Sequence, residues 1–582
     1  RGNDNNYSHG TLYNSGTLTL GTKDGNVSKE SPVITGATYG IQNSGTFNFY
    51  DGIIKGKTNA INGVVTEIEE GYEIIKETIE SYEVKYLDKL PIAKLVNKDK
   101  EYTDLQEAIN DAETGETIEI LRDATFISTT ETFEVPESKN ITIDIKGYTL
   151  TRANSTLLNN KGTLEIKDSG KGEEGSKTYG KLENTGGTII ENSGTLRLNN
   201  VVVNSNGTVV TTSGILEIIN STMISSNGTT IINSDSGNIT INSGTITGYS
   251  SAISNKGTGK IIINEGTINK TDEHDPSTIT NISSGTIEIN GGTITSPYRS
   301  NTINNSSSGK IIINEGTITP YGWFSGIINS SVGEVEINGG KITNISNNGL
   351  LTVNDGIVYG YGSSYGINNG GIANIIGGSI IRGNDNNYSH GTLYNSGTLN
   401  VSAGIIKGND SIITNSGGTV NIENVTLSGS NIGISNTGSG IVNLAVSVTI
   451  NANNIGISNS ATINIGTKDG NVSTEMPVVT GKTYGVSNGD SGKVNFYDGI
   501  VSGESGAFYG TVNEVEPGYK IVTNKTDTLT SATLTLVGDD EKVAVLNGIN
   551  FTSLQDAINS ASDTNESIIT LYKDVTFESN IT

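Results

Sequence analysis

A short pattern recurs through most of the chain: an aliphatic residue, any residue, then Asn, usually with Gly a few positions later. It reads IENSG at 190–194, ISNKG at 253–257 and ITNSG at 413–417. The steps average about 23 residues, within the roughly 20–50-residue period that marks a solenoid. The Asn of this pattern occupies thirteen positions: Asn192, Asn233, Asn255, Asn281, Asn305, Asn329, Asn347, Asn369, Asn395, Asn415, Asn436, Asn459 and Asn488.

These Asn residues predict a ladder. Asn is disfavoured inside strands but common in turns. A buried Asn needs partners for its amide oxygen and both N–H groups, and a stack with one Asn per coil supplies them because each side chain bonds the next. Thr212, in VVTTSG, stands where one further Asn would fall. The alternative is that Asn and Gly are ordinary loop residues of a low-complexity chain; their fixed register against Ile favours the ladder.

The segments between these turns alternate as β-strands do. In GTIEINGGTIT at 285–295, Ile287 and Ile289 alternate with polar residues, so one strand face is apolar. Asn290 and Gly292 then turn the chain into the next strand. Each coil should place its Ile and Val residues over those of the next coil. The region from Asn160 to Asn488 would hold about 15 coils, a stack of roughly 70 Å at a strand spacing of ~4.8 Å.

The predicted fold class is therefore all-β, a parallel β-helix solenoid. An apolar content of 33% alone would suggest disorder, but the periodicity overrules that reading. With no Cys, the chain has no disulfide framework. A net charge of −25 argues against nucleic acid and anionic membranes as partners, and no apolar run approaches the ~20 residues of a membrane span. The chain starts with Arg, so we expect a processed or cut segment.

Long internal repeats indicate a tandem array. Residues 1–18 recur unchanged at 382–399, and GTKDGNVS at 21–28 recurs at 466–473. Whole coils have been gained or lost between the copies, which a solenoid tolerates because each coil touches only its neighbours. The expected domains are the last coils of a preceding β-helix unit at 1–64, an extended connector that could be a hairpin at 65–92, a complete β-helix unit at 93–512, a second connector at 513–540, and the start of the next unit at 541–582.

A helical signal precedes each new run of coils. In YTDLQEAINDAETGETIEIL, Thr103 and Gln106 fit a T-x-x-Q capping box, which predicts a helix at about 103–114. The same signal returns at 551–561, with Thr552 and Gln555 as the box. A short helix of this kind can cover the open end of a solenoid; the alternative is an ordinary surface helix. One apolar face is expected from Leu105, Ala108, Ile109 and Ala112.

The combination of LQEAINDA…GETIEILRDATF, ITIDIKGYTLT and serial NSGTL and INGGTI units resembles a known family. It is similar to the right-handed parallel β-helix repeats, of pectin-lyase-like fold, in large cell-surface proteins of Gram-positive bacteria. The resemblance implies a right-handed β-helix with an extracellular, cell-surface location. It does not imply one function, because this fold serves lyases, hydrolases, tailspikes, adhesins and inert stalks.

Few residues suggest chemistry. The densest polar cluster is TDEHDP at 271–276, with Asp272, Glu273, His274 and Asp275. It could form a metal or acid–base site, but a solvated loop is the favoured reading. Glycoside chemistry needs two carboxylates at a set separation, and no such pair stands out. We therefore expect no catalytic residue, no metal site and no cofactor.

Aromatic residues recur in the loops that follow the GTIT-type strands. Because they fall at comparable points of successive coils, they should lie along one side of the solenoid. Local shielding of the core edge is the favoured explanation; lateral contact between solenoids and binding of sugar rings are the alternatives. The predicted strip consists of Tyr249, Tyr298, Tyr321, Trp323, Phe324, Tyr361, Tyr365 and Tyr388.

The sequence favours a non-enzymatic structural protein of the bacterial exterior, a rigid stalk, fibre, filament or surface layer. Its expected partners are further copies of itself, end to end, side by side or in one covalent array. The second hypothesis is an adhesin that binds glycan or a host surface through the aromatic strip. The third is a polysaccharide lyase or hydrolase.

Overall fold

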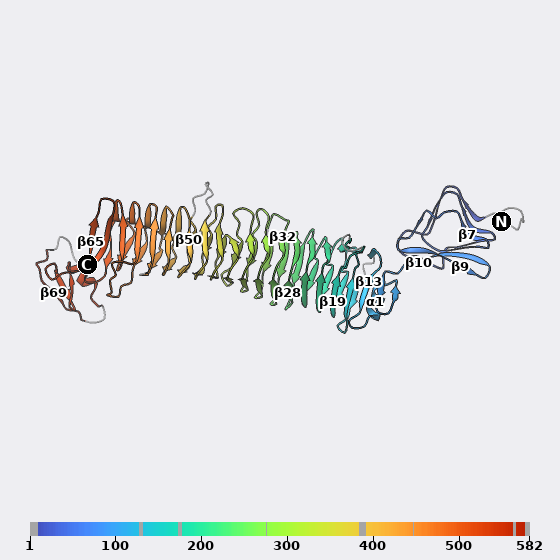
Figure 1. The fold of residues 1–582 in the computed structure, drawn as a ribbon, viewed down its shortest axis with the longest axis horizontal. Helices are drawn as coiled ribbons and strands as arrows, with labels where there is room; N and C mark the ends of the chain where they lie inside the picture. The colour runs from blue at the N-terminus through green and yellow to red at the C-terminus, as the bar shows by residue number, and fades with distance from the viewer. Residues whose placement is uncertain are drawn as a thin grey trace. The chain divides into compact units, whose positions relative to one another are not determined.

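The computed structural model describes residues 10–126, 132–172, 177–274, 276–382, 391–445, 447–562 and 566–576. The chain is all-β, and its coils stack in parallel as a β-solenoid of about 20 turns (Figure 1). This confirms the fold class that the sequence predicts. Two compact units divide the chain: unit 1 holds residues 1–153 and 166–181, and unit 2 holds residues 154–165 and 182–582.

Unit 1 begins with stacked parallel coils. Their buried core includes Ile41, Phe47, Phe49 and Ile54. Asn14 Nδ2 donates to Asn43 Oδ1 at 2.7 Å, so these coils carry a ladder rung as well. The first coils are built from β1 (Gly10–Asn14), β4 (Tyr39–Asn43) and β7 (Asn59–Asn62) in one sheet, β2 (Thr17–Leu20), β5 (Thr46–Phe49) and β8 (Glu67–Ile68) in another, and β3 (Val33–Gly36) and β6 (Ile53–Gly56) in a third.

Both regions that the sequence suggests as connectors contain antiparallel hairpins. In unit 1, β9 (Tyr72–Ile79) pairs with β10 (Tyr82–Lys89), and β10 pairs antiparallel with β6 of the last coil. In unit 2, β65 (Tyr519–Lys525) pairs with β66 (Thr530–Leu536), which pairs antiparallel with β62 (Ile500–Gly503). Each hairpin therefore occupies a strand edge that would otherwise expose unpaired backbone groups.

The helix α1 (Leu105–Asp111) lies within the predicted region, and the four residues of its predicted apolar face are buried. Its predicted capping box is wrong by one residue. The N-cap is Asp104, whose carboxylate accepts from Gln106 N at 2.6 Å. The Gln106 side chain instead accepts from Glu134 N at 2.7 Å and donates to Glu134 O at 3.0 Å. It thus holds the helix on β15 (Phe133–Val135).

The second helix, α2 (Leu554–Asn559), shows the same shift: Ser553, not Thr552, caps it by accepting from Asp556 N at 3.1 Å. In both helices the residue directly before the first turn has an extended backbone and a short oxygen-bearing side chain. That position reaches the first free N–H groups of the helix, whereas the preceding Thr does not. α2 packs with β67 (Ala544–Leu546), β68 (Ile549–Phe551) and β69 (Ile569–Leu571).

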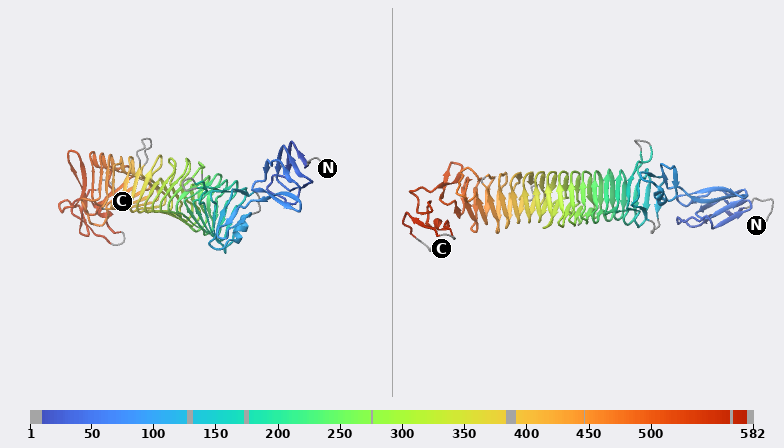
Figure 2. Two further views of the ribbon diagram at one scale, coloured as in Figure 1. Left: turned by 45° about the vertical axis from the view of Figure 1, so that its right-hand side comes forward. Right: turned by 90° about the horizontal axis from the view of Figure 1, so that it is seen from below.

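In unit 2, each coil contributes one strand to each of three parallel sheets, and Figure 2 shows the stacked coils in two further views. One coil consists of β33 (Ile279–Asn281), β34 (Thr286–Ile289) and β35 (Thr293–Thr295), and the next begins at β36 (Ile303–Asn305). Within unit 2, the first sheet runs from β22 (Thr195–Asn199) to β64 (Glu514–Val515), the second from β23 (Val202–Ser205) to β62, and the third from β18 (Leu158–Asn160) to β63 (Gly506–Tyr509).

The core of unit 2 is a set of aliphatic columns. Ile287 and Ile289 are fully buried, and they pair in register with Ile311 and Ile313 of the next coil. Ile294 of the second sheet stacks in the same way on its successor. Burying a side chain of this size contributes roughly 1.5–3 kcal/mol relative to leaving it in water. Each coil repeats the contribution of the one before it.

The interior Asn ladder is present beside these columns. Asn281 Nδ2 donates to Asn305 Oδ1 at 2.9 Å and to Gly285 O at 3.0 Å, and Asn305 repeats both bonds one coil later. Both N–H groups and the carbonyl of such an Asn are thus used inside the protein. The thirteen predicted Asn residues are all buried, Asn160 adds a further rung before them, and their coil-to-coil amide bonds measure 2.7–3.0 Å.

The ladder explains why Gly follows the Asn. A Cβ on Gly309 would lie 2.0 Å from Asn281 Nδ2, and one on Gly333 would lie 2.3 Å from Asn329 Oδ1. The stacked amides occupy the space that a side chain would need. The I-x-N…G motif therefore describes one packing unit rather than a flexible loop.

Thr212 continues the ladder in one direction only. It lies in register between Asn192 and Asn233, and its hydroxyl accepts from Asn192 Nδ2 at 2.9 Å. The same hydroxyl donates to Gly214 O at an oxygen–oxygen distance of 3.4 Å. Asn233 Oδ1 is consequently buried without a hydrogen-bond partner among the described residues. This is a defect within an otherwise continuous stack.

We predict that Thr212→Asn stabilises the protein. The turn at 212–214 has the same T/N-S-G form as the turn at Asn192, and the introduced amide would donate to the unpartnered oxygen of Asn233. The free energy of unfolding should rise by about 1 kcal/mol, measured from guanidinium denaturation. The matched control is Thr211→Asn, at the half-buried outward position next to it, which should give no gain because Asn is disfavoured in a strand. Equal midpoints for the two variants would contradict the prediction.

Candidate functional site

The outward face of the first sheet of unit 2 changes character along the stack. In its earlier coils it carries ion pairs: Lys260 lies 2.6 Å from Glu288, and Lys310 lies 2.7 Å from Glu334 and 2.8 Å from Glu336. The hydrogen bond from Lys260 holds the pKa of Glu288 below its ordinary value. These part-exposed pairs contribute little stability, but they give this stretch a charged surface.

The later coils carry an uncharged amide array on the same face, which we call the face ladder. Each side chain after the first donates from Nδ2 to the Oδ1 of the preceding rung at 2.7–2.9 Å. The strands pair in register at these positions. The face ladder consists of Asn374, Asn400, Asn421, Asn443, Asn464 and Asn495, on β46 (Ile372–Ile375), β49 (Thr398–Val401), β52 (Thr419–Ile422), β55 (Ile441–Leu444), β58 (Thr462–Ile465) and β61 (Lys493–Phe496).

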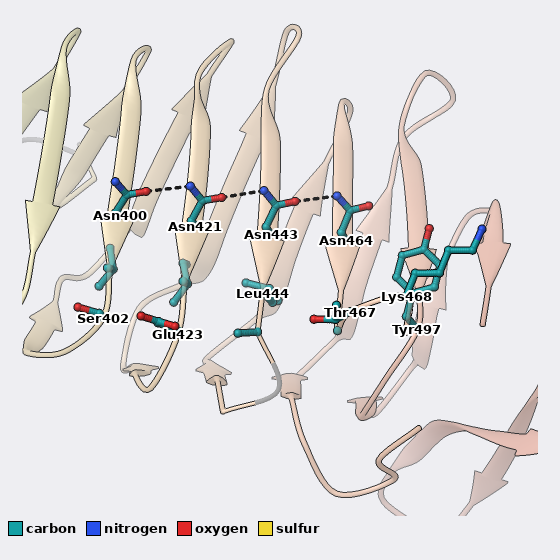
Figure 3. Close-up of a pocket in the computed structure, with 14 residues that line it drawn as sticks. Asn400, Ser402, Asn421, Glu423, Asn443, Leu444, Asn464, Thr467, Lys468 and Tyr497 are labelled. Atoms are coloured by element: carbon teal, nitrogen blue, oxygen red, sulfur yellow. Dashed lines mark hydrogen bonds between the residues drawn. The ribbon is translucent and has the colours of Figure 1, made fainter. Parts of the chain in front are cut away.

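A trough of about 640 Å³ runs beside the face ladder (Figure 3). Four ladder residues form one side, and the residues just beyond the strand ends, including Ser402 and Glu423, form the other. Val401, Ile422 and Leu444 lie between these two rows, but they are core residues with only 1–2% of their surface exposed. The trough therefore offers chiefly the amide row and the residues beyond the strand ends, rather than an aliphatic base.

Lys468 and Tyr497 stand at one end of the trough (Figure 3). Lys468 forms an ion pair with Glu514, and Tyr497 shares a hydrogen bond of 3.0 Å with the same carboxylate. Burial, and then the bond to Glu514, raise the pKa of Tyr497 well above its ordinary value. The phenol therefore stays neutral at physiological pH, and the lysine charge is balanced.

Unit 1 contains the same cluster at the corresponding place. Lys23 pairs with Glu67, and the hydroxyl of Tyr50 lies 2.7 Å from the second oxygen of Glu67. The bond to Glu67, together with burial, raises the pKa of Tyr50. The repetition follows from the duplicated sequence and shows that the last coil of each unit is built in the same way.

A second external row, which we call the turn ladder, lies at the ends of earlier strands in the first sheet. Asn242 Nδ2 donates to the carboxylate of Glu217 at 2.8 Å, which fixes the direction of the whole row because a carboxylate only accepts. The coil-to-coil bonds then measure 2.7–2.9 Å. The row consists of Asn242, Asn264, Asn290, Asn314, Asn338 and Asn354, and none of these residues lines the trough.

The predicted aromatic strip lies in the loops that join the second sheet to the third, but only part of it forms one cluster. The ring of Tyr298 is 5.8 Å from that of Tyr321 and 6.4 Å from those of Trp323 and Phe324. Tyr321 and Trp323 are 64% and 43% exposed, so the cluster presents aromatic surface to solvent. We call these four residues the aromatic cluster.

Neighbouring loops support the cluster. Gly362 packs so closely that an added Cβ would lie 3.0 Å from the Cβ of Trp323, and Ser364 Oγ donates to Trp323 O at 2.5 Å. The buried Arg382 donates to the carbonyls of Gly362 and Ser364, both at 2.5 Å. This arrangement gives the loop after β44 (Ile357–Gly360) a fixed shape.

The other predicted strip residues lie apart from the cluster. Tyr361 is exposed in the neighbouring loop. Tyr365 packs on Tyr394 at 5.2 Å, Tyr249 is exposed in an earlier loop, and Tyr388 lies outside the described residues. The strip is therefore a cluster with separate members on the same side of unit 2, rather than one continuous stack.

The acidic cluster at 271–276 does not assemble a site within the described part of the chain. His274 Nδ1 lies 3.5 Å from Asp272 Oδ1, and Asp275 lies outside the described residues. Lys270, which is buried, donates to Pro276 O at 2.5 Å and so ties the loop to its own strand. Among the described residues, no group of three or more His, Asp or Glu side chains is placed to hold a metal.

Sequence reasoning missed both external ladders. The turn ladder can be read from INGG, INEG and VNDG, where Asn precedes the Gly-containing turn. The face ladder can be read from TLNV, TVNI, IVNL and TINI, where Asn stands between two inward aliphatics. Aligning the coils on the interior Asn would have placed both sets in columns. No helix in the described ranges has the length and apolar character needed to cross a membrane.

We predict that Tyr298→Ala exposes the indole of Trp323, the one tryptophan of the chain. Loss of the edge-to-face contacts should shift the tryptophan emission to longer wavelength and lower the free energy of unfolding by about 1 kcal/mol. Tyr249→Ala, in an equivalent loop outside the cluster, is the control and should leave the emission unchanged. An unshifted spectrum for Tyr298→Ala would show that the four rings do not pack together in solution.

Comparison with protein-family models, curated proteins and solved structures found no match. The parallel β-solenoid fold does not by itself specify a function. The surfaces of this chain are therefore the guide to its function.

Proposed function

We propose that this chain is a non-enzymatic structural segment of a protein on the bacterial exterior. In this role the solenoid acts as a stiff spacer in a stalk, fibre, filament or surface layer. The resemblance of its sequence to right-handed, pectin-lyase-like β-helix repeats of Gram-positive surface proteins supports the location. Its function would then lie in length, rigidity and repetition.

The observation that carries this proposal is the continuity of the interior ladder. From Asn233 to Asn488 every coil is joined to the next by a buried amide bond, beside aliphatic residues that repeat in register. Bending such a stack would break bonds inside the core, where an unpaired amide costs about 1–3 kcal/mol. A stack of this kind therefore resists bending and extension more strongly than coils joined by surface contacts alone.

Electron microscopy of the native source, with gold-labelled antibody against this chain, tests the proposal. The label should follow fibres, stalks or a layer outside the cell wall. Isolated protein should also release no reducing sugar from plant and bacterial polysaccharides. Label inside the cell, or a steady release of sugar, would contradict the structural role.

The exposed aromatic cluster favours one second candidate, an adhesin that binds glycan or another protein through this surface. Exposed aromatic rings are enriched in binding sites because they offer large apolar area with little conformational entropy to lose. The variant Tyr321→Ala/Trp323→Ala/Phe324→Ala should then lose binding on a glycan array or lateral association in sedimentation. Tyr249→Ala serves as the control. Full binding and association by the triple variant would exclude this candidate.

A further inference from the structure

Near the end of each run of coils, a loop of the same sequence is bound by two carboxylates. In unit 2 this loop, which we call the end loop, is GTKDGNVS at 466–473, and it leads from β58 of the first sheet toward β59 (Val478–Gly481) of the second. Asp498 is 1% exposed, and its Oδ1 accepts from Ser473 N. Glu516 is 4% exposed, and its Oε1 accepts from Gly470 N at 2.9 Å. Two buried carboxylates therefore bind the main chain of one loop.

The other oxygen of each carboxylate is buried without a partner. Asp498 Oδ2 and Glu516 Oε2 accept no hydrogen bond within the described residues. Burial raises the pKa of both side chains above their ordinary values, because a carboxylate that loses water without gaining donors is costly. Lys468 of the end loop forms its ion pair with Glu514 instead. The two buried oxygens thus lack a positive partner.

The corresponding place in unit 1 repeats this arrangement. The end loop there is GTKDGNVS at 21–28, and the two carboxylates belong to Asp51 and Glu69, which are 18 residues apart like their counterparts in unit 2. Ser28 N donates to Asp51 Oδ1 at 2.5 Å, and Gly25 N donates to Glu69 Oε1 at 3.1 Å. Glu69 is 6% exposed, and its Oε2 is again buried without a partner. The unpartnered oxygen is therefore a property of the motif.

We propose that each end loop, together with its two carboxylates, binds one hard divalent cation, and that calcium is the ion that fits. In unit 2 the ligands would be Asp498 Oδ2 and Glu516 Oε2, whose two charges balance those of the ion. Hard cations prefer oxygen ligands, including main-chain carbonyls. Within the described residues, the carbonyls of 467–472 accept no main-chain N–H, so they are available as further ligands. The site needs no third acidic side chain.

Other ions fit these ligands less well. Calcium accepts six to eight oxygens in a flexible geometry, whereas magnesium requires a nearly octahedral shell and keeps several waters. The buried oxygens of Asp498 and Glu516 leave little surface for a hydrated ion. Zinc prefers nitrogen and sulfur ligands, and the end loops contain neither His nor Cys. The site is distinct from the aromatic cluster and does not rest on the structural role proposed above.

Equilibrium dialysis of the full chain against radioactive calcium, after treatment with EDTA, tests the proposal. We expect two ions per chain at pH 7 and physiological salt, with dissociation constants at or below about 1 mM. Magnesium should compete at least about tenfold more weakly than unlabelled calcium. Because Asp51 is only partly buried, the site in unit 1 should be the weaker of the two.

Variants that replace one carboxylate by an amide assign the sites. Glu516→Gln and Glu69→Gln should each bind one ion, and the double variant should bind none. The matched control is Glu475→Gln, at an exposed position just after the end loop of unit 2, which should still bind two. Calcium should raise the unfolding temperature of the parent chain but not that of the double variant. In EDTA the double variant should unfold at or above the temperature of the parent, which shows that it is folded.

Three results would overturn the proposal. One is a parent chain that binds no calcium at millimolar concentration, which would show that protons rather than a cation neutralise these carboxyl groups. Another is a double variant that binds calcium as the parent does. The third is loss of an ion from Glu475→Gln, which would place the binding on the exposed acidic surface.

Discussion

The structure depends on one interaction, the buried hydrogen bond between the amides of Asn residues in consecutive coils. Parallel coils bring the same residue of each turn to the same place, about one strand spacing apart. An amide is both donor and acceptor, so a single residue type can bond copies of itself without limit. Asn281, Asn305 and Asn329 show the full pattern, since each also uses its second N–H on a main-chain carbonyl.

This bond also sets which residues can stand nearby. Most of the other buried residues are aliphatic, because the amides of the row already bond one another and the main-chain carbonyls. Gly follows in most of the turns, where the neighbouring amide fills the space of a Cβ, and Ala461 takes that place after Asn459. Thr212 shows the limit of substitution: its hydroxyl accepts from the coil before but leaves the amide oxygen of the coil after without a donor.

The same chemistry on the outer surface has a different consequence. The face ladder and the turn ladder make coil-to-coil amide bonds of the same length as the interior ones, yet they face solvent. Their remaining N–H groups and lone pairs are therefore offered outward in a regular row. A row of that kind can be neutral where the rest of the sheet face is charged, as the change from Lys310 and Glu336 to Asn400 and Asn421 illustrates.

The sequence predicts the interior well and the exterior poorly, and the reason is physical. A buried position tolerates few residue types. The I-x-N pattern of Ile253 and Asn255 therefore recurs in coil after coil and can be recognised in the sequence. An outward position tolerates many, so Asn400 looks like any solvent-facing residue until the coils are aligned. The predicted helix caps are wrong for a related reason. Thr103 and Asp104 are both good capping residues, and only the backbone geometry shows that Asp104 is the N-cap. Ring packing among Tyr298, Tyr321 and Trp323 depends on loop conformation, which periodicity does not specify.

The most direct test of this account is the hydrogen exchange of Asn side-chain NH2 groups, followed by NMR on protein labelled with ¹⁵N-asparagine. The account predicts two classes. Side chains of the interior ladder, such as Asn305, should keep their protons in D2O as long as backbone amides of the core strands do, because both open only when coils separate. Side chains of the face ladder, such as Asn421, should exchange at least one proton far sooner. Rapid exchange of every Asn side chain would contradict the buried ladder on which the fold is built.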